Sequence, residues 1–143
     1  MIPTSLFNKG ILLDTCYIIH LIKHNKLDIL ERKKYDEKIG ITTFNMHELE
    51  RKSKELYLHY TLPEIFLLPI PFYPGHNYNE IVFVSEIEPE LLEAIDDPSD
   101  AVLAAAAIKF GAKKIITRDK QHLLNNNAKH LMEKYNIEIK SEL

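Results

Sequence analysis

The sequence predicts an α/β protein in which helices cover both faces of a central, mainly parallel sheet. Three observations indicate this architecture. Short apolar or β-branched runs alternate with longer segments of helical pattern. Sequential strands are separated by a helix, which is the crossover that parallel neighbours need. The length of 143 residues, with 45% apolar and 27% charged residues, predicts one domain spanning residues 1–143 with a proper core.

Strands are expected where apolar or β-branched residues run together between turn signals. These stretches are 11–14, 38–43, 65–70, 115–117 and 137–140. Helices are expected where apolar residues recur at helical spacing, and these stretches are 15–23, 28–34, 44–57, 88–95, 98–110, a short piece from 119 to 124, and 128–134. Residues 72–80 carry Pro-Gly and are expected to be turn-like, and 81–84 are either a strand or part of a helix.

One stretch, 97–119, combines an acid-led helix, a glycine turn, a short strand and a second acid. Asp97, followed by proline, is typical of a helix start, and Gly111 is typical of a helix end. From Asp100 the helix descends roughly 15 Å at ~1.5 Å per residue. The strand climbs back roughly 16 Å to Asp119 at ~3.3 Å per residue. We therefore expect the carboxylates of Asp100 and Asp119 at the same end of the molecule.

Two further acids are expected at that end, because sites in parallel α/β sheets lie beyond the carboxyl ends of the strands. Asp14 directly follows the first strand, and Glu48 lies about one turn into the helix after the second. Asp14, Glu48, Asp100 and Asp119 are thus predicted to converge on one edge. Four carboxylates in one cleft repel one another, so their proximity predicts a hard divalent cation, Mg²⁺ or Mn²⁺.

A cation site of this kind suits the hydrolysis of a phosphodiester. A carboxylate-bound ion can orient and deprotonate a water for in-line attack, and a second ion could stabilise the leaving oxygen. Thr15 and Thr117 flank two of the acids and could hydrogen-bond a carboxylate, a metal-bound water or a phosphate of the substrate. Arg118 and Lys120 are the basic residues best placed beside the site to contact phosphate.

Each acid also has a simpler interpretation. An Asp at a strand-to-helix junction is often only an N-cap, which applies to Asp14 and Asp119, and Glu48 alone is typical of a helix surface. Cys16 is expected to be a buried apolar residue. His122 is expected on the surface, because no metal-ligand spacing accompanies it. The combined order of the four acids is what favours the functional interpretation.

From Ile11 to about Leu124 the chain resembles a PIN domain. The resemblance rests on four motifs: ILLDT with Asp14, ITTFNMHELER with Glu48, SDAVLAAAA with Asp100, and IITRD with Asp119. It implies a three-layer α/β/α sandwich and a Mg²⁺- or Mn²⁺-dependent endoribonuclease. It also implies that these four acids are the catalytic and metal-binding residues. Thr117 matches a small hydroxyl position that often precedes the last acid.

The sequence departs from the family pattern just after Asp119. Many members carry a further acid and then an aromatic residue where Gln121 and His122 stand here. The missing acid affects the binding of a second metal ion more than it affects activity. Stand-alone domains of this size are often toxins of VapBC-type pairs, inhibited by a partner peptide at the acidic cleft, and others process RNA. The resemblance therefore implies an RNA substrate, an antitoxin-type protein inhibitor and a homodimer.

Two alternatives to a nuclease remain open. Gln121 and the unusual residues 71–87 favour a catalytically inactive PIN-like module that binds RNA or a protein. A receiver-like phosphoacceptor domain also carries acids at a sheet edge, but it groups two of them early in the chain. The single cysteine and the lack of a signal peptide or a long apolar run predict a cytoplasmic protein with no membrane span. The net charge of −3 disfavours a general nucleic-acid-coating protein.

Overall fold

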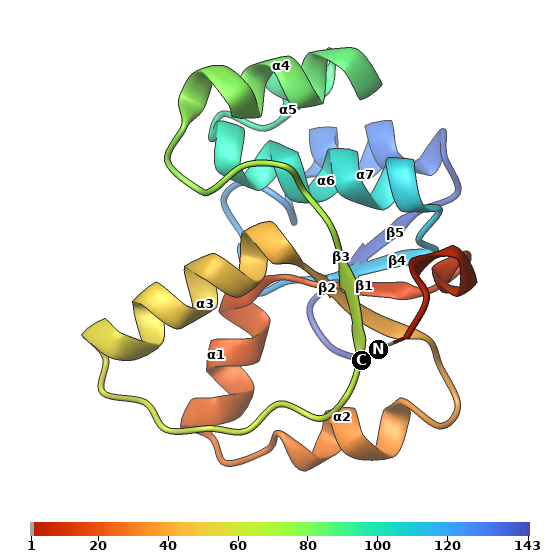
Figure 1. The fold of residues 1–143 in the computed structure, drawn as a ribbon. Helices are drawn as coiled ribbons and strands as arrows, with labels where there is room; N and C mark the ends of the chain where they lie inside the picture. The colour runs from red at the N-terminus through yellow and green to blue at the C-terminus, as the bar shows by residue number, and fades with distance from the viewer. Residues whose placement is uncertain (1) are drawn as a thin grey trace.

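The computed structural model describes residues 2–143 and is a three-layer α/β/α sandwich (Figure 1). Five strands form one central sheet in the order β3-β2-β1-β4-β5, and every neighbouring pair is parallel. The predicted fold class is therefore confirmed, and the sheet is parallel throughout the described residues. No helix within residues 2–143 is long and apolar enough to cross a membrane.

The strands are short and almost entirely buried at the sheet centre. Their bounds are β1 Ile11–Leu13, β2 Ile39–Thr42, β3 Phe66–Leu68, β4 Lys114–Ile116 and β5 Glu138–Lys140. The helical segments are the 3₁₀ turn η1 Thr4–Phe7 and the α-helices α1 Thr15–Lys23, α2 Asp28–Lys33, α3 Thr43–Glu55, α4 Asn77–Ile87, α5 Leu91–Ala94, α6 Pro98–Phe110 and α7 Asn126–Glu133.

Helices α1, α2 and α3 cover one face of the sheet, and α4 to α7 cover the other (Figure 1). The side chains of β1 show why two layers are needed. Leu12 packs into the core under α4 to α7, whereas Ile11 and Leu13 pack into the core under α1 to α3. Strand residues alternate between the two faces, so each hydrophobic face must be covered by its own helices.

Helix α6 lies between the sheet and α4 and is buried over most of its length (Figure 1). Its four consecutive alanines let neighbouring elements approach closely. The helix ends at Gly111, whose backbone has the left-handed φ of 71° that glycine adopts without strain. The predicted start and stop of this helix are therefore confirmed, and they place its acidic N-terminus over the sheet edge.

Helix α4 begins earlier than the sequence analysis expected. Residues 77–80 belong to α4 rather than to a turn, and residues 81–84 are helical as well. The reason is a tertiary contact of Glu80, which is fully buried. Its carboxylate accepts hydrogen bonds from the Ser99 hydroxyl at 3.0 Å and from the Gly75 N–H at 2.9 Å. Pairing with α6 thus extends a helix that its turn-forming residues do not indicate.

The expected short helix over residues 119–124 is wrong, because this segment is a turn. The Asp119 side chain accepts the N–H groups of Gln121 and His122, and the Asn125 side chain then caps the next helix. Helix α5 is also shorter than the expected 88–95, because the backbone of Glu88 closes α4 instead. The 3₁₀ turn η1 was not predicted, and its Phe7 is fully buried against β2.

Candidate active site

The four predicted acids all follow the carboxyl ends of strands or return to that edge. Asp14 caps α1 directly after β1, and Glu48 lies on α3, which starts where β2 ends. Asp100 lies in the first turn of α6, and Asp119 follows β4. This placement follows from parallel strand order, since β2, β1 and β4 are adjacent in the sheet. Within this edge the acids form two pairs.

The first pair is Asp14 and Glu48, joined by the side-chain amide of Asn45. Its Nδ2 donates toward Asp14 Oδ1 at 3.3 Å and toward Glu48 Oε1 at 3.2 Å. Its Oδ1 accepts from the Thr42 hydroxyl at 2.7 Å, which fixes the direction of the amide. Asn45 is 2% exposed and was not predicted. The available signal was its spacing, because Thr42, Asn45 and Glu48 recur at helical intervals of three.

Asp14 is buried and held by four donors. Its Oδ1 accepts from the backbone N–H of Thr15 at 2.8 Å as well as from Asn45. Its Oδ2 accepts from the Thr117 hydroxyl at 2.7 Å and from the Cys16 thiol at 3.2 Å. These donors fix the orientation of the carboxylate, and only the weak thiol contact would be easily given up to another ligand.

The second pair is Asp100 and Asp119, which interact because the charge of Asp119 acts on the Asp100 carboxyl group. Burial, followed by the charge of Asp119, raises the pKa of Asp100 to about 9. Two adjacent carboxylates cannot both ionise freely, so this pair retains a proton at neutral pH unless a cation replaces it. Asp100 and Asp119 thus interact at the edge of the sheet where the sequence predicts both.

Electrostatic effects link the two pairs. Burial raises the pKa of Asp14, and the charge of Asp119 adds to the effect. Burial also raises the pKa of Glu48 to about 7, with a further contribution from the charge of Asp14. The charge of Asp14 in turn acts on Asp100. The four acids therefore form one region of unfavourable negative charge, which is what a divalent cation would relieve.

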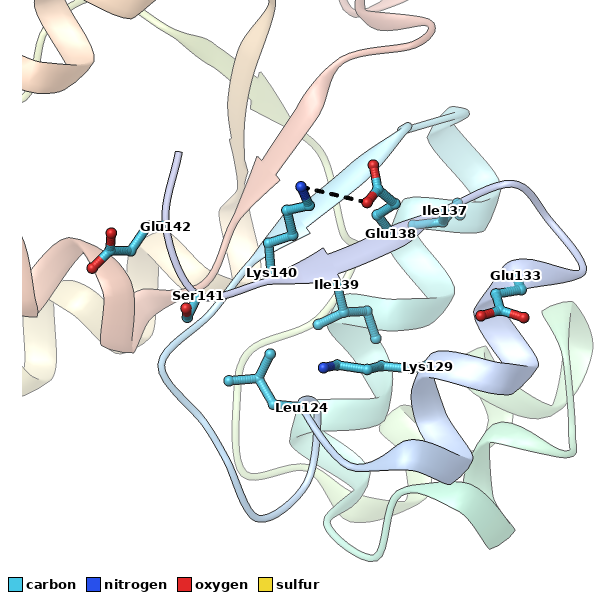
Figure 2. Close-up of a pocket in the computed structure, with 9 residues that line it drawn as sticks. All are labelled: Leu124, Lys129, Glu133, Ile137, Glu138, Ile139, Lys140, Ser141 and Glu142. Carbon is cyan, nitrogen blue, oxygen red and sulfur yellow. Dashed lines mark ion pairs between the residues drawn. The ribbon is translucent and has the colours of Figure 1, made fainter.

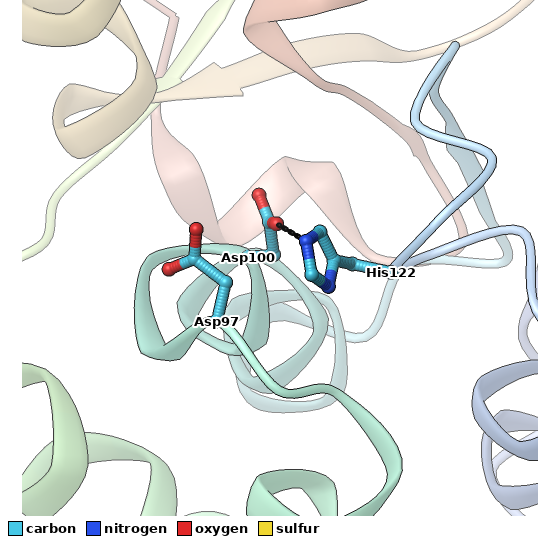
Figure 3. Close-up of side chains that lie close together, drawn as sticks. All are labelled: Asp97, Asp100 and His122. Carbon is cyan, nitrogen blue, oxygen red and sulfur yellow. Dashed lines mark ion pairs between the residues drawn. The ribbon is translucent and has the colours of Figure 1, made fainter.

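His122 faces this region, although the sequence analysis expected it on the surface. Its Nε2 lies 3.9 Å from Asp100 Oδ2, and its side chain is 22% exposed (Figure 3). One ligand atom each from Asp97, Asp100 and His122 lie within 4.8 Å of one another, and no other trio of His, Cys, Asp or Glu in residues 2–143 is so compact. Asp97 also caps α6, accepting from the Ser99 N–H at 2.9 Å, as predicted.

Thr15 and Thr117 lie in the network but are too buried to touch a substrate. They are 1% and 0% exposed. The Thr15 hydroxyl lies 3.3 Å from Glu48 Oε1, and the Thr117 hydroxyl donates to Asp14 and accepts from the Asp119 N–H at 3.0 Å. Of the three roles considered for them, the structure supports hydrogen bonding to a carboxylate, so they position acids instead of contacting phosphate.

The basic residues beside the site differ in their surroundings. Arg118 Nη1 lies 3.3 Å from Glu142 Oε1, so the C-terminal segment partly neutralises it. Lys120 is exposed and has no ion pair with any described residue. Lys120 is therefore the freer of the two predicted phosphate contacts.

Cys16 is a polar member of the network, so its description as a buried apolar residue needs correction. Its Sγ lies 3.3 Å from the Thr117 hydroxyl and accepts the Arg118 N–H at 3.2 Å, besides donating to Asp14. Burial and the nearby charge of Asp14 raise the pKa of the thiol to about 12. Cys16 is thus a protonated hydrogen-bond donor, and it is not set up as a nucleophile.

The donor set fits a divalent cation such as Mn²⁺ or Mg²⁺. Asp97 and Asp100 offer carboxylate oxygens beside His122, and the charge of Asp119 acts on Asp100, so a cation could replace the proton that Asp100 retains. Imidazole is a better ligand for transition metals than for Mg²⁺, so His122 favours Mn²⁺. The carboxylate of Asp14 is held in a fixed orientation by its own hydrogen bonds.

A separate hollow of about 600 Å³ lies beside the edge strand β5 (Figure 2). It is lined by residues from β5, α7 and the C-terminal segment, including Lys129, Ile139 and Lys140. None of the four predicted acids lines it. The carboxylate region and this hollow are therefore distinct features of the molecule.

The chain was compared with protein-family models and with curated proteins. No family model matches it, and no curated protein matches it significantly.

Proposed function

We propose that this protein is a metal-dependent endoribonuclease of the PIN type that hydrolyses RNA phosphodiester bonds. The observation that carries the proposal is that Asp14, Asp100 and Asp119 gather at the carboxyl edge of a parallel sheet, where burial and the charge of Asp119 raise the pKa of the other two acids. Carboxylates so placed are unfavourable without a positive charge, and a divalent cation bound to RNA phosphate supplies that charge. The four motifs of the sequence support the same function.

The residues divide into ligands and positioning groups. The cation, Mg²⁺ or Mn²⁺, would be held by the four predicted acids, Asp14, Glu48, Asp100 and Asp119. Asp97 and His122 lie close enough to Asp100 to contribute further ligands. The bound ion would supply positive charge that makes water more acidic and offsets charge on the phosphate.

Glu48 has a second role in this proposal. In the metal-free protein its pKa is raised to about 7, so its carboxyl group exchanges a proton near neutral pH, and a bound cation would take the place of that proton. Asn45, Thr15 and Thr117 hold the acids in place.

The biological setting is part of the proposal. A cytoplasmic toxin of a VapBC-type pair is one assignment, and an RNA-processing nuclease is the other. In the first, an antitoxin-type protein would cover the carboxylates and a homodimer would be the active unit. Co-expression with the neighbouring reading frame would separate the two, because only a toxin requires a bound inhibitor for its host to grow.

The test is cleavage of a labelled RNA of mixed sequence with Mg²⁺, Mn²⁺ or EDTA. We expect cleavage with either metal and none in EDTA. Asp100→Asn and Asp119→Asn should each reduce the rate by about 100-fold or more, because each removes a carboxylate that would hold the cation against the substrate phosphate. Asp36→Asn is the matched control, since Asp36 is exposed and precedes β2 at the opposite edge of the sheet. Undiminished cleavage by folded Asp100→Asn would contradict the proposal.

An inactive module that binds RNA or a protein is the second candidate. The specific observation in its favour is that all four acceptor positions of Asp14 are already used by donors of the protein itself. This candidate predicts that folded wild-type protein binds RNA without cutting it in Mn²⁺. It also predicts that Asp100→Asn leaves the affinity for RNA unchanged.

A further inference from the structure

We infer that the rings of Tyr73 and His47 form a stacking platform for an unpaired base of single-stranded RNA, beside the carboxylates. This inference rests on the proposed function and adds to it a subsite for one base of the substrate. The two ring centroids lie 4.5 Å apart with an interplanar angle of 56°. Tyr73 is 61% exposed, so one ring is presented to solvent while the other supports it.

His47 ties the platform to α3, the helix that also carries Glu48. His47 immediately precedes Glu48, and both lie in the second turn of the helix whose first turn carries Asn45. The segment that carries Tyr73 is also connected to α6. Ser99, which adjoins Asp100, bonds to Glu80, and Glu80 accepts the N–H of Gly75. The segment that carries Tyr73 is thus tied to both helices that carry the acids.

This segment is held in place before any ligand binds. The Thr43 hydroxyl accepts the N–H of Ile70 at 2.8 Å. The ring of Phe72 packs edge-on against Phe44 at 5.6 Å and against Phe83 at 5.5 Å. Phe72 therefore anchors the segment in the core, while its neighbour Tyr73 remains outside. A ring held in this way stacks on a ligand with little loss of conformational freedom.

The charge next to the platform suits a phosphate backbone. Arg51 and Lys52 lie one helical turn beyond His47 and Glu48 on α3. Neither forms an ion pair with the residues described, 2–143. Proteins that bind single-stranded RNA combine such cations with aromatic rings on which bases stack.

The geometry favours an unpaired base over a duplex. A base inside a duplex already stacks on both of its faces, so it has no free face for Tyr73. A base next to the cut phosphate rotates out at little cost where its strand is single, whereas in a duplex it must first lose its pairing and stacking. The RNA cut by this protein should therefore be single-stranded, or looped, at the position that reaches Tyr73.

The experiment measures binding of a short single-stranded RNA by fluorescence anisotropy, in Mn²⁺, in an Asp100→Asn background that leaves the RNA uncut. Tyr73→Ala should weaken binding by roughly 5- to 100-fold, which corresponds to the loss of one base stack. Tyr73→Phe should bind within about twofold of the parent, because it keeps the ring. Tyr35→Ala is the control, since Tyr35 is 78% exposed and precedes β2 at the other edge of the sheet.

A second readout reports stacking directly. RNA carrying 2-aminopurine should lose fluorescence on binding the parent and Tyr73→Phe, but not on binding Tyr73→Ala. If the parent and Tyr73→Ala bind the RNA with equal affinity, while the wild type still cleaves RNA in a metal-dependent way, the stacking platform is contradicted and the proposed nuclease activity is not. Loss of self-association in Tyr73→Ala, with RNA affinity unchanged, would also contradict the platform, because it would show that Tyr73 contacts a second copy of the chain. Folded wild type that neither binds nor cuts RNA would overturn both.

Discussion

Burial and the charge of Asp119 raise the pKa of the Asp100 carboxyl group, although α6 and β4 separate the two residues along the chain. The helix carries one acid to the sheet edge at its N-terminus, and the strand delivers the other at its carboxyl end. This interaction is the most direct sign that the fold concentrates negative charge at one place. It also means that the site should affect stability independently of any activity.

The first prediction concerns pH and the metal-free protein. The folded-state pKa of Asp100 is raised to about 9 and that of Glu48 to about 7, whereas both are lower in the unfolded chain. The folded protein therefore binds more protons than the unfolded one, and stability falls as the pH rises between the unfolded and folded values. From pH 5 to pH 9 in EDTA we expect a loss of about 1–2 kcal/mol after allowance for solvent screening.

Melting curves in EDTA check this prediction, with an expected drop in Tm of about 3–8 °C. Asp100→Asn should flatten the pH dependence and raise the Tm of the metal-free protein at pH 8, and Mn²⁺ should raise the Tm of the wild type but not of the variant. Asp36→Asn should follow the wild type. A Tm of the wild type that rises steadily over this range would contradict the described charge cluster.

A second prediction concerns the buried amide that joins Asp14 and Glu48. Asn45→Ala removes a donor shared by both acids and should lower the free energy of unfolding by about 2–4 kcal/mol, because the carboxylates are left unpaired in a buried place. Chemical denaturation measures the change. Asn127→Ala is the matched control, since Asn127 is an exposed residue of α7 and should change stability by no more than about 0.5 kcal/mol.

A third prediction concerns the choice of metal. His122 Nε2 lies close to Asp100, and imidazole is a ligand that suits Mn²⁺ better than Mg²⁺. His122→Asn should therefore reduce cleavage in Mn²⁺ by about tenfold and change cleavage in Mg²⁺ less. His130→Asn, on the exposed surface of α7, should change neither rate. Equal loss with both metals would indicate that His122 positions the loop rather than the ion.

A fourth prediction concerns the ion pair between Arg118 and Glu142. Glu142→Gln frees the guanidinium for phosphate and should raise RNA affinity about two- to fivefold at low salt, since exposed pairs contribute at most about 1 kcal/mol. Anisotropy titrations at several salt concentrations measure the effect. Glu138→Gln breaks the comparable pair with Lys140 on β5 (Figure 2) and serves as control. Identical gains from both variants would point to net charge alone.

Prediction from the sequence worked best where a local pattern and the strand order act together. Asp14 and Asp119 follow strands directly, and the alternation of strands and helices is enough to place both at the carboxyl edge. It failed where a contact from elsewhere in the chain decides the local structure. The start of α4 depends on the bonds of Glu80 to Ser99 and Gly75, and no residue within α4 indicates them.

The site shows the same division. The sequence by itself determined the α/β class, the parallel order of the elements and the edge to which four acids return, because these follow from periodicity and from the handed, local geometry of helix and strand. Only the tertiary structure decided that Asn45 and Cys16 bond to Asp14 and that His122 faces Asp100. It also decided that the side chains of Thr15 and Thr117 are buried. Side-chain contacts of this kind depend on close packing between residues that are distant along the chain. The spacing of residues in the sequence does not predict such contacts.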